Sequence, residues 1–216
     1  MIIKPKLLPL WFLNLCFSVM SWFLERWFNK LVIREVASKP AHSYLLMCNH
    51  FSFWDGFWAT YLCWRTLRKQ HQLNRIYIMV MKKQMQMNPW LRYFGCFSVS
   101  PGRASVNESV AYAAELLNTP GNVVLMYPQG NLESNHVREI VMNDGIAHIV
   151  SRVQGPCQLL WSSNLVEYFE SLSPSVYFDM LDCGIREEFN LLELSWKINA
   201  HHREAVKRQF RFTEEA

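Results

Sequence analysis

The sequence predicts an α/β fold: a mixed sheet covered by helices and preceded by an N-terminal membrane-associated helix. Short apolar runs alternate with longer segments whose apolar residues recur at helical spacing, and this alternation is typical of α/β proteins. The 216 residues fit one sizeable domain better than two small ones. Hydrophobic residues make up 50% and charged residues 19% of the chain, which excludes wholesale disorder.

The chain begins with an uncharged apolar stretch from Leu7 to Leu24, with Lys4 and Lys6 before it and Arg26 after it. Its length is at the lower limit of about 18 residues for crossing a bilayer. Flanking basic residues and aromatic side chains favour a helix seated in the membrane interface. A short transmembrane helix and a helix covering the core are the alternatives. We expect residues 1–36 to anchor the chain and residues 37–216 to form the functional domain.

The elements after the anchor follow from local patterns. Apolar runs rich in β-branched and aromatic residues predict strands at Ser43–Cys48, Arg75–Met81, Cys96–Ser100, Asn122–Tyr127, Cys157–Ser162 and Ser175–Leu181. Helical spacing predicts helices at Phe53–Leu67, Ser105–Leu117, Val137–Val153 and Glu187–Phe210, with a short helical piece from Asn88 to Gly95. Ser105 and Glu108 match a capping box. His201 and His202 fall in the charged last helix and are expected to be solvated.

Charge and cysteine content narrow the functional class. The net charge of +4 suits an anionic bilayer or a phosphate-bearing substrate, whereas the scattered basic residues argue against nucleic acid. The six cysteines form no C-x-x-C pair and several lie in apolar runs, as expected of buried thiols in a reducing compartment. Cysteine and histidine spacing supports no metal site. The chain has no G-x-S-x-G elbow and no glycine-rich nucleotide loop.

Two polar clusters directly follow predicted strands, where α/β folds place their sites. They are Asn49–Asp55 (NHFSFWD) and Tyr127–Asn131 (YPQGN). On one regular helix His50 and Asp55 would point about 140° apart. They can meet only if His50 lies in a loop and Asp55 in the first turn of the next helix. A carboxylate on one ring nitrogen would then leave the other nitrogen to accept a proton.

Spacing alone leaves other interpretations open. His50 could be an ordinary core histidine beside an aspartate that caps a helix. Cys48, two residues before His50, could form a Cys–His pair, but it closes an apolar strand where a reactive thiolate is not expected.

The ordered motifs resemble those of the PlsC-like glycerolipid acyltransferase family, which includes the 1-acylglycerol-3-phosphate acyltransferases. Asn49, His50, Ser52 and Asp55 match N-H-x-S-x-x-D. The other matching segments are Met81–Gln84, similar to the family's lysine-bearing segment, Gly95–Val99, similar to G-x-x-F-(I/V), and Tyr127–Asn131, similar to F-P-E-G-T. The resemblance extends over about residues 43 to 160 in the family's order and spacing.

The resemblance implies a membrane-associated O-acyltransferase at the cytoplasmic face of the inner membrane. It would move a fatty acyl group from acyl-CoA or acyl carrier protein to a lysolipid hydroxyl in membrane lipid synthesis, with no further cofactor. His50 would be the general base and Asp55 its orienting partner. The substrate-binding residues it suggests are Asn49, Ser52, Lys83, Arg103, Pro128, Gln129 and Gly130, with Asn49 or amides near Gly130 as oxyanion donors. Lys82 and Lys83 could contact phosphates or be solvated.

Two departures from the family's pattern affect the acceptor. Gln129 stands where the family has Glu, so the side chain can still form hydrogen bonds but carries no charge. Pro101 lies where the second motif has an Arg that contacts the acceptor phosphate, and Arg103 comes slightly later. An acceptor with another head group, such as an aminolipid, is therefore expected beside lysophosphatidate. A non-catalytic membrane-associated protein that retains the fold is the alternative function.

Overall fold

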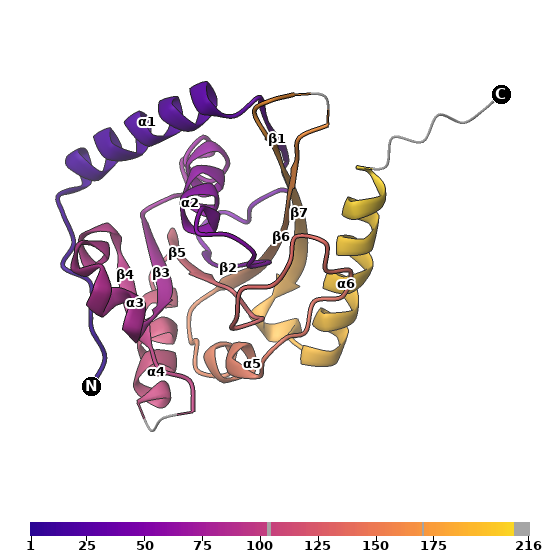
Figure 1. The fold of residues 1–216 in the computed structure, drawn as a ribbon. Helices are drawn as coiled ribbons and strands as arrows, with labels where there is room; N and C mark the ends of the chain where they lie inside the picture. Colours follow the sequence, from indigo (N-terminus) through magenta and orange to yellow (C-terminus); the bar gives the residue numbers. More distant parts are fainter. Residues whose placement is uncertain (103–104, 170, 210–216) are drawn as a thin grey trace.

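A seven-stranded sheet forms the centre of the protein (Figure 1), in a computed structural model that describes residues 1–102, 105–169 and 171–209. Five strands run parallel, the edge pair β1 and β7 is parallel to each other, and β7 is antiparallel to β6. The spatial order is β1 (Lys30–Arg34), β7 (Ser175–Ile185), β6 (Cys157–Glu167), β2 (Ser43–Cys48), β5 (Asn122–Met126), β3 (Arg75–Met81) and β4 (Cys96–Val99).

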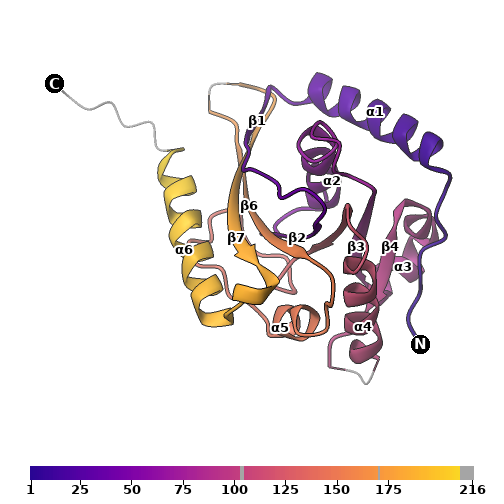
Figure 2. The same ribbon diagram turned by 180° about the vertical axis from the view of Figure 1, so that it is seen from behind.

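Helices cover both faces of this sheet (Figures 1 and 2). One face carries α1 (Leu10–Trp27) and α2 (Asp55–Arg65), and the other carries α4 (Val106–Leu117), α5 (Gly145–Val150) and α6 (Leu191–Lys207). The short elements are α3 (Lys82–Met87), η1 (Pro89–Phe94) and η2 (Arg186–Glu188). The mixed α/β sheet flanked by helices is therefore confirmed.

The β2 strand shows why its sequence is apolar throughout. Tyr44, Leu46 and Cys48 pack toward α1 and α2, while Leu45 and Met47 pack toward the opposite helices. All six residues of the strand are buried because both faces of a central parallel strand are covered. Met47 is in register with Met126 of β5 and Trp161 of β6, so the carboxyl ends of these strands meet at one edge.

The residues before α1 protect the edge of the sheet. Ile3 exchanges two hydrogen bonds with Ser98 of β4: its N–H donates to Ser98 Oγ at 2.8 Å, and its carbonyl accepts from Ser98 N–H at 3.0 Å. This extended segment occupies hydrogen-bonding groups that an edge strand would otherwise expose. None of the helices in the described ranges is long and apolar enough to cross a membrane.

The predicted strands are confirmed, with β6 and β7 longer than expected. The structure adds β1 and α3, which the sequence analysis did not identify. Because β1 lies within residues 1–36 and pairs with β7, the N-terminal segment contributes a strand to the sheet. Nothing else in the structure bears on the proposed boundary at residue 36, which stays a prediction.

The predicted helix at Val137–Val153 is wrong, because only Gly145–Val150 is helical. A side chain from α6 holds the preceding backbone: Asn199 accepts from Ile140 N–H at 2.7 Å and donates to the Ile140 carbonyl at 3.0 Å. These long-range hydrogen bonds replace the bonds that a helix would have formed at Ile140. The local apolar pattern was therefore overridden by tertiary contacts.

Two helix starts also differ from expectation. The Ser105 side chain makes no capping hydrogen bond, and Glu108 instead pairs with the N-terminal ammonium at 3.4 Å and accepts from Ile2 N–H. The last helix begins at Leu191, because Asn190 caps it by accepting from two backbone N–H groups. Its expected end at Phe210 lies outside the described residues.

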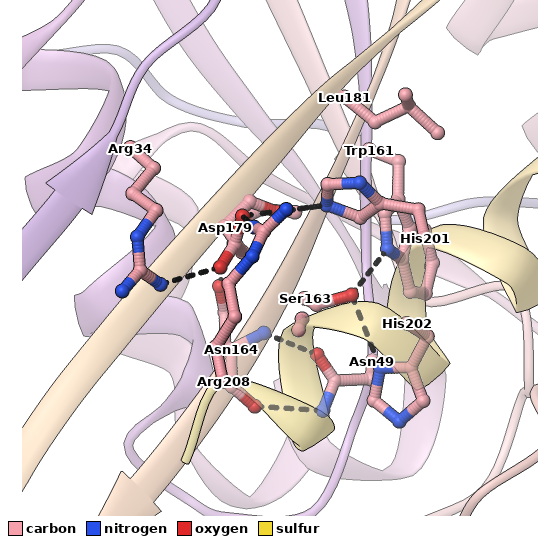
Figure 3. A network of polar contacts seen from close by, with 12 residues as sticks. Arg34, Asn49, Trp161, Ser163, Asn164, Asp179, Leu181, His201, His202 and Arg208 are labelled. Carbon is pink, nitrogen blue, oxygen red and sulfur yellow. Dashed lines mark hydrogen bonds and ion pairs between the residues drawn. The ribbon is translucent and has the colours of Figure 1, made fainter.

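Asp179 of β7 links the edge strand β1 to the chain just after α6 (Figure 3). It is 2% exposed and pairs with Arg34 of β1 and Arg208 after α6, each at 2.6 Å. His201 donates from Nε2 to the Asp179 carbonyl at 3.0 Å. The two guanidinium groups compensate the buried carboxylate and fasten the chain's last described turn to the first strand.

Candidate active site

His50 and Asp55 meet at the carboxyl end of β2. His50 lies in the loop after the strand and Asp55 is the first residue of α2, so the loop-then-helix arrangement predicted from their spacing is confirmed. The Nδ1–H of His50 donates to Asp55 Oδ2 at 2.6 Å. Among the described residues no hydrogen bond engages Nε2 of His50, and its side chain is 28% exposed. In the neutral imidazole, Nε2 is therefore the nitrogen that can accept a proton.

The Asp55 carboxylate organises the whole loop. Its Oδ2 also accepts from the backbone N–H groups of Phe51 at 2.7 Å and Ser52 at 2.9 Å. Asp55 is fully buried, and its place in the first turn of α2 lets the helix dipole favour a negative charge. The Ser52 hydroxyl accepts from Trp54 N–H at 3.1 Å, which gives this residue a local part in shaping the turn.

Tyr127, directly after β5, holds the His50 ring from one side. The two rings stack with centroids 4.3 Å apart and planes 22° apart. The Tyr127 hydroxyl is buried without a hydrogen-bond partner in the described part of the chain, and burial raises the pKa of Tyr127 well above its usual range. The phenol stays neutral, so its contribution is to fix the orientation of the imidazole.

The alternative Cys–His pair is not supported by the structure. Cys48 is completely buried on the β2 strand, and burial raises the pKa of its thiol well above the ordinary value. A thiol in that state carries almost no thiolate at neutral pH and is a poor nucleophile.

Gln129, in the loop after β5, contacts the loop that carries His50. It is 7% exposed, and its Oε1 accepts from the backbone N–H of His50 at 2.8 Å. Its Nε2 donates to the carboxylate of Glu133. Gln129 therefore lies beside the dyad, as its motif predicts, but it contacts the backbone of His50 and not the ring.

The Asn49 side chain binds Asn164 of β6 (Figure 3). Its Nδ2 donates to the Asn164 carbonyl at 2.9 Å, and its Oδ1 accepts from Asn164 N–H at 2.7 Å. Gly130 N–H donates to the Tyr127 carbonyl at 3.1 Å. The Asn49 side chain and the Gly130 N–H are therefore both engaged within the protein, and the suggestion of an oxyanion donor among the other amides near Gly130 stays a prediction.

Replacing Asn49 with alanine should lower the free energy of unfolding by about 2–4 kcal/mol. The substitution removes two hydrogen bonds and leaves the buried Asn164 N–H and carbonyl unpaired. Urea unfolding of the purified variant measures this, with Asn107→Ala at an exposed position of α4 as control. A loss no larger than that of the control would show that the pair contributes nothing to stability.

A second layer of polar groups lies behind Asn49 (Figure 3). Trp161 Nε1 donates to Ser163 Oγ at 2.8 Å, and Ser163 contacts His202 Nδ1 at 3.0 Å. His202 Nε2 lies 3.1 Å from the Val137 carbonyl and donates to it. Nδ1 must then accept from the Ser163 hydroxyl. His202 is 1% exposed, so the expectation that it is solvated is wrong.

The protein should lose stability as the pH falls below about 6.5, the pKa of histidine in an unfolded chain. Burial lowers the pKa of His202, so near that pH the unfolded chain binds more protons than the native state. Urea unfolding at pH 7.5 and pH 5.5 measures the effect. In His202→Gln the part of the pH dependence due to this residue should vanish, and an unchanged dependence would refute the assignment.

Three other suggested binding residues, Pro128, Gly130 and Lys83, follow strands that end at the same edge of the sheet. Pro128 is buried, and its carbonyl accepts from Asn143 N–H at 3.0 Å. Gly130 has a φ of +76°, where a side chain would be strained. Lys83 is exposed in α3, which follows β3, and β3 lies two strands, or about 10 Å, from β2. Arg103 lies outside the described residues.

Glu133 is the residue of this site that sequence reasoning missed. Its N–H donates to the His50 carbonyl at 2.8 Å, and its carboxylate accepts from Gln129. Glu133 lies in a segment that was predicted to precede a helix. In such a segment a spacing of four residues does not indicate that Glu133 contacts Gln129. The only related sequence feature was Gln129 itself, which stands where the family has Glu and so lacks a negative charge at that position.

The geometry fits a base that deprotonates a hydroxyl. Asp55 orients the imidazole, Tyr127 stacks on it, and Nε2 remains available to a proton donor. Comparison with known proteins agrees with this chemistry. A family model described as Acyltransferase matches residues 30–161, well over half of the chain, and includes both motif loops. Among curated proteins, none matches the chain significantly.

Proposed function

The chain belongs to the acyltransferase family, and from that premise we propose that it acylates the hydroxyl of a membrane lysolipid with an acyl thioester as donor. The observation that carries the proposal is the His50–Asp55 hydrogen bond, which leaves Nε2 open at the edge of the sheet. The donor is acyl-CoA or acyl carrier protein. Both present the same thioester carbonyl to the site.

The proposed reaction has two steps: the acceptor hydroxyl attacks the thioester carbonyl, and the tetrahedral intermediate then breaks down. Nε2 of His50 takes the proton of the acceptor hydroxyl while the hydroxyl oxygen forms a bond to the thioester carbonyl carbon. The tetrahedral intermediate then expels the thiolate, the C–S bond breaks, and the imidazolium returns its proton to the sulfur. Asp55 stabilises the imidazolium between these events.

The outer face of α1 supports the proposed location at a membrane. Its exposed large apolar side chains include Trp11, Leu15, Val19 and Trp22, which recur at helical spacing and are between 55% and 69% exposed. Exposed basic residues flank the helix at Lys4, Lys6, Arg26 and Lys30. An apolar face with basic ends fits a helix lying in the interface of an anionic bilayer.

The contacts of α1 would bring that membrane close to the dyad. Phe28, just after α1, packs edge-to-face on Trp54 at 6.1 Å and on Trp58 at 5.8 Å. Trp54 immediately precedes Asp55, and exposed Phe53 lies in the same loop. A lysolipid could thus keep its chain in the leaflet while its hydroxyl approaches His50. We place the enzyme at the cytoplasmic face of the inner membrane, where its six free cysteines would stay reduced.

The decisive experiment gives purified protein a labelled acyl donor and a panel of lysolipids. Both acyl-CoA and acyl carrier protein thioesters are offered, with lysophosphatidate and head-group variants as acceptors. Transfer to at least one acceptor supports the proposal. Release of free fatty acid without acceptor would indicate a thioesterase, and absence of all turnover would favour the non-catalytic alternative.

A further inference from the structure

The side-chain amide of Gln129 has only one orientation that satisfies its neighbours. Its Oε1 must face the His50 backbone N–H, which can only donate, and its Nε2 must face the Glu133 carboxylate, which can only accept. Gln129 is therefore a bridge between the dyad loop and a carboxylate. The residue type at position 129 and the charge at position 133 depend on each other.

Glu133 is tied to His50 by two separate routes. Its backbone N–H donates directly to the His50 carbonyl at 2.8 Å, and its side chain connects through Gln129 to the His50 N–H. Glu133 is half-buried, and in residues 1–102, 105–169 and 171–209 no ion pair engages it. A carboxylate offers about four acceptor positions, and the bridge uses one of them.

A glutamate at position 129 would disrupt this arrangement. It would place two carboxylates in contact in a half-buried site, where like charges repel strongly. It would also lack the N–H that now binds Glu133. The chain therefore keeps one negative charge beside the dyad, four residues further along than the position where the resembling motif carries it.

We infer that the carboxylate of Glu133 binds an ammonium group on the head of the acceptor lysolipid. This inference rests on the proposed acyl transfer. The carboxylate attracts a cation and repels a phosphate monoester dianion. Both effects favour an amine-bearing acceptor over lysophosphatidate. Pro101, which can supply no charge, stands where the resembling motif has its phosphate-binding Arg.

The test compares two acceptors of the same chain length, lysophosphatidylethanolamine and lysophosphatidate, in the same neutral detergent. The wild type should prefer the amine-bearing acceptor. Glu133→Gln should lower kcat/KM for that acceptor by at least about tenfold, mainly through a higher KM, because a charge-assisted hydrogen bond is lost. Lysophosphatidate should be affected much less. Glu139→Gln, which removes an exposed carboxylate from the same loop, is the matched control.

The exchange of the two residues tests their coupling. Gln129→Glu alone should lower activity and also lower the melting midpoint by about 2–4 °C. The double variant Gln129→Glu with Glu133→Gln should recover most of both losses, because an amide and a carboxylate again face each other. Recovery supports the pair as one unit.

Other results would overturn the inference. Glu133→Gln behaving like Glu139→Gln, or losing activity equally on both acceptors, would show that Glu133 does not recognise the head group. If the wild type transfers to no acceptor, the proposed function fails and the ammonium assignment falls with it. The unfolding cycle would then decide the pair by itself, with simply additive losses at positions 129 and 133 overturning the coupling.

Discussion

Substitution of His50 by alanine is expected to lower acyl transfer by about 10²–10⁴-fold, the usual contribution of a positioned general base. The alcohol of an acceptor is a weak nucleophile until its proton is removed, and Nε2 of His50 is the nitrogen left open by the bond to Asp55. The loss should appear in kcat, with a much smaller change in KM. Initial rates with the preferred acceptor and a labelled donor measure it.

Two comparisons make this expectation sharp. His148→Ala removes an exposed histidine from α5 and should leave the rate unchanged. Asp55→Asn keeps the size of the side chain but can present a donor to Nδ1, so it should impair transfer by favouring the wrong tautomer. Thermal unfolding of each variant checks that the fold persists. Equal turnover by the wild type and His50→Ala would refute the dyad mechanism.

Glutamate at both Leu15 and Trp22 is expected to reduce binding to anionic vesicles by about a hundredfold or more. These side chains lie on the outer face of α1 and are 55% and 66% exposed, so their contact with lipid would bury apolar area that is now in water. Losing both contacts costs about 3 kcal/mol or more before any charge penalty is added. Vesicle co-sedimentation measures the partition coefficient.

The matched control places the same substitutions on another exposed apolar pair. Leu192 and Trp196 lie on α6, on the opposite side of the sheet from α1, and are 83% and 68% exposed. Glutamate at these two positions should leave vesicle binding nearly unchanged. An equal loss from both double variants would show that general hydrophobicity, and not the α1 face, governs binding. No binding by the wild type would refute the proposed location.

Local sequence was sufficient for six of the seven strands and for the possibility of a contact between His50 and Asp55. The central strands are short, apolar on both faces and bounded by polar residues, so their positions can be read from composition alone. His50 and Asp55 follow one of them at a spacing that allows contact only across a loop and a helix start. The match to the family also covers the loop at Tyr127–Asn131, which contains Gln129.

Tertiary structure decided the features that depend on distant residues. Asn199 holds residue 140 out of a helix, β1 exists because β7 offers it a partner, and His202 is buried because Ser163 and Val137 satisfy its ring. No local pattern encodes such partners, since they lie far away in the chain. The sequence by itself determined that His50 and Asp55 could meet across a loop and a helix start. Only the folded chain revealed Glu133, because its pairing with Gln129 forms in a loop whose path is set by distant contacts.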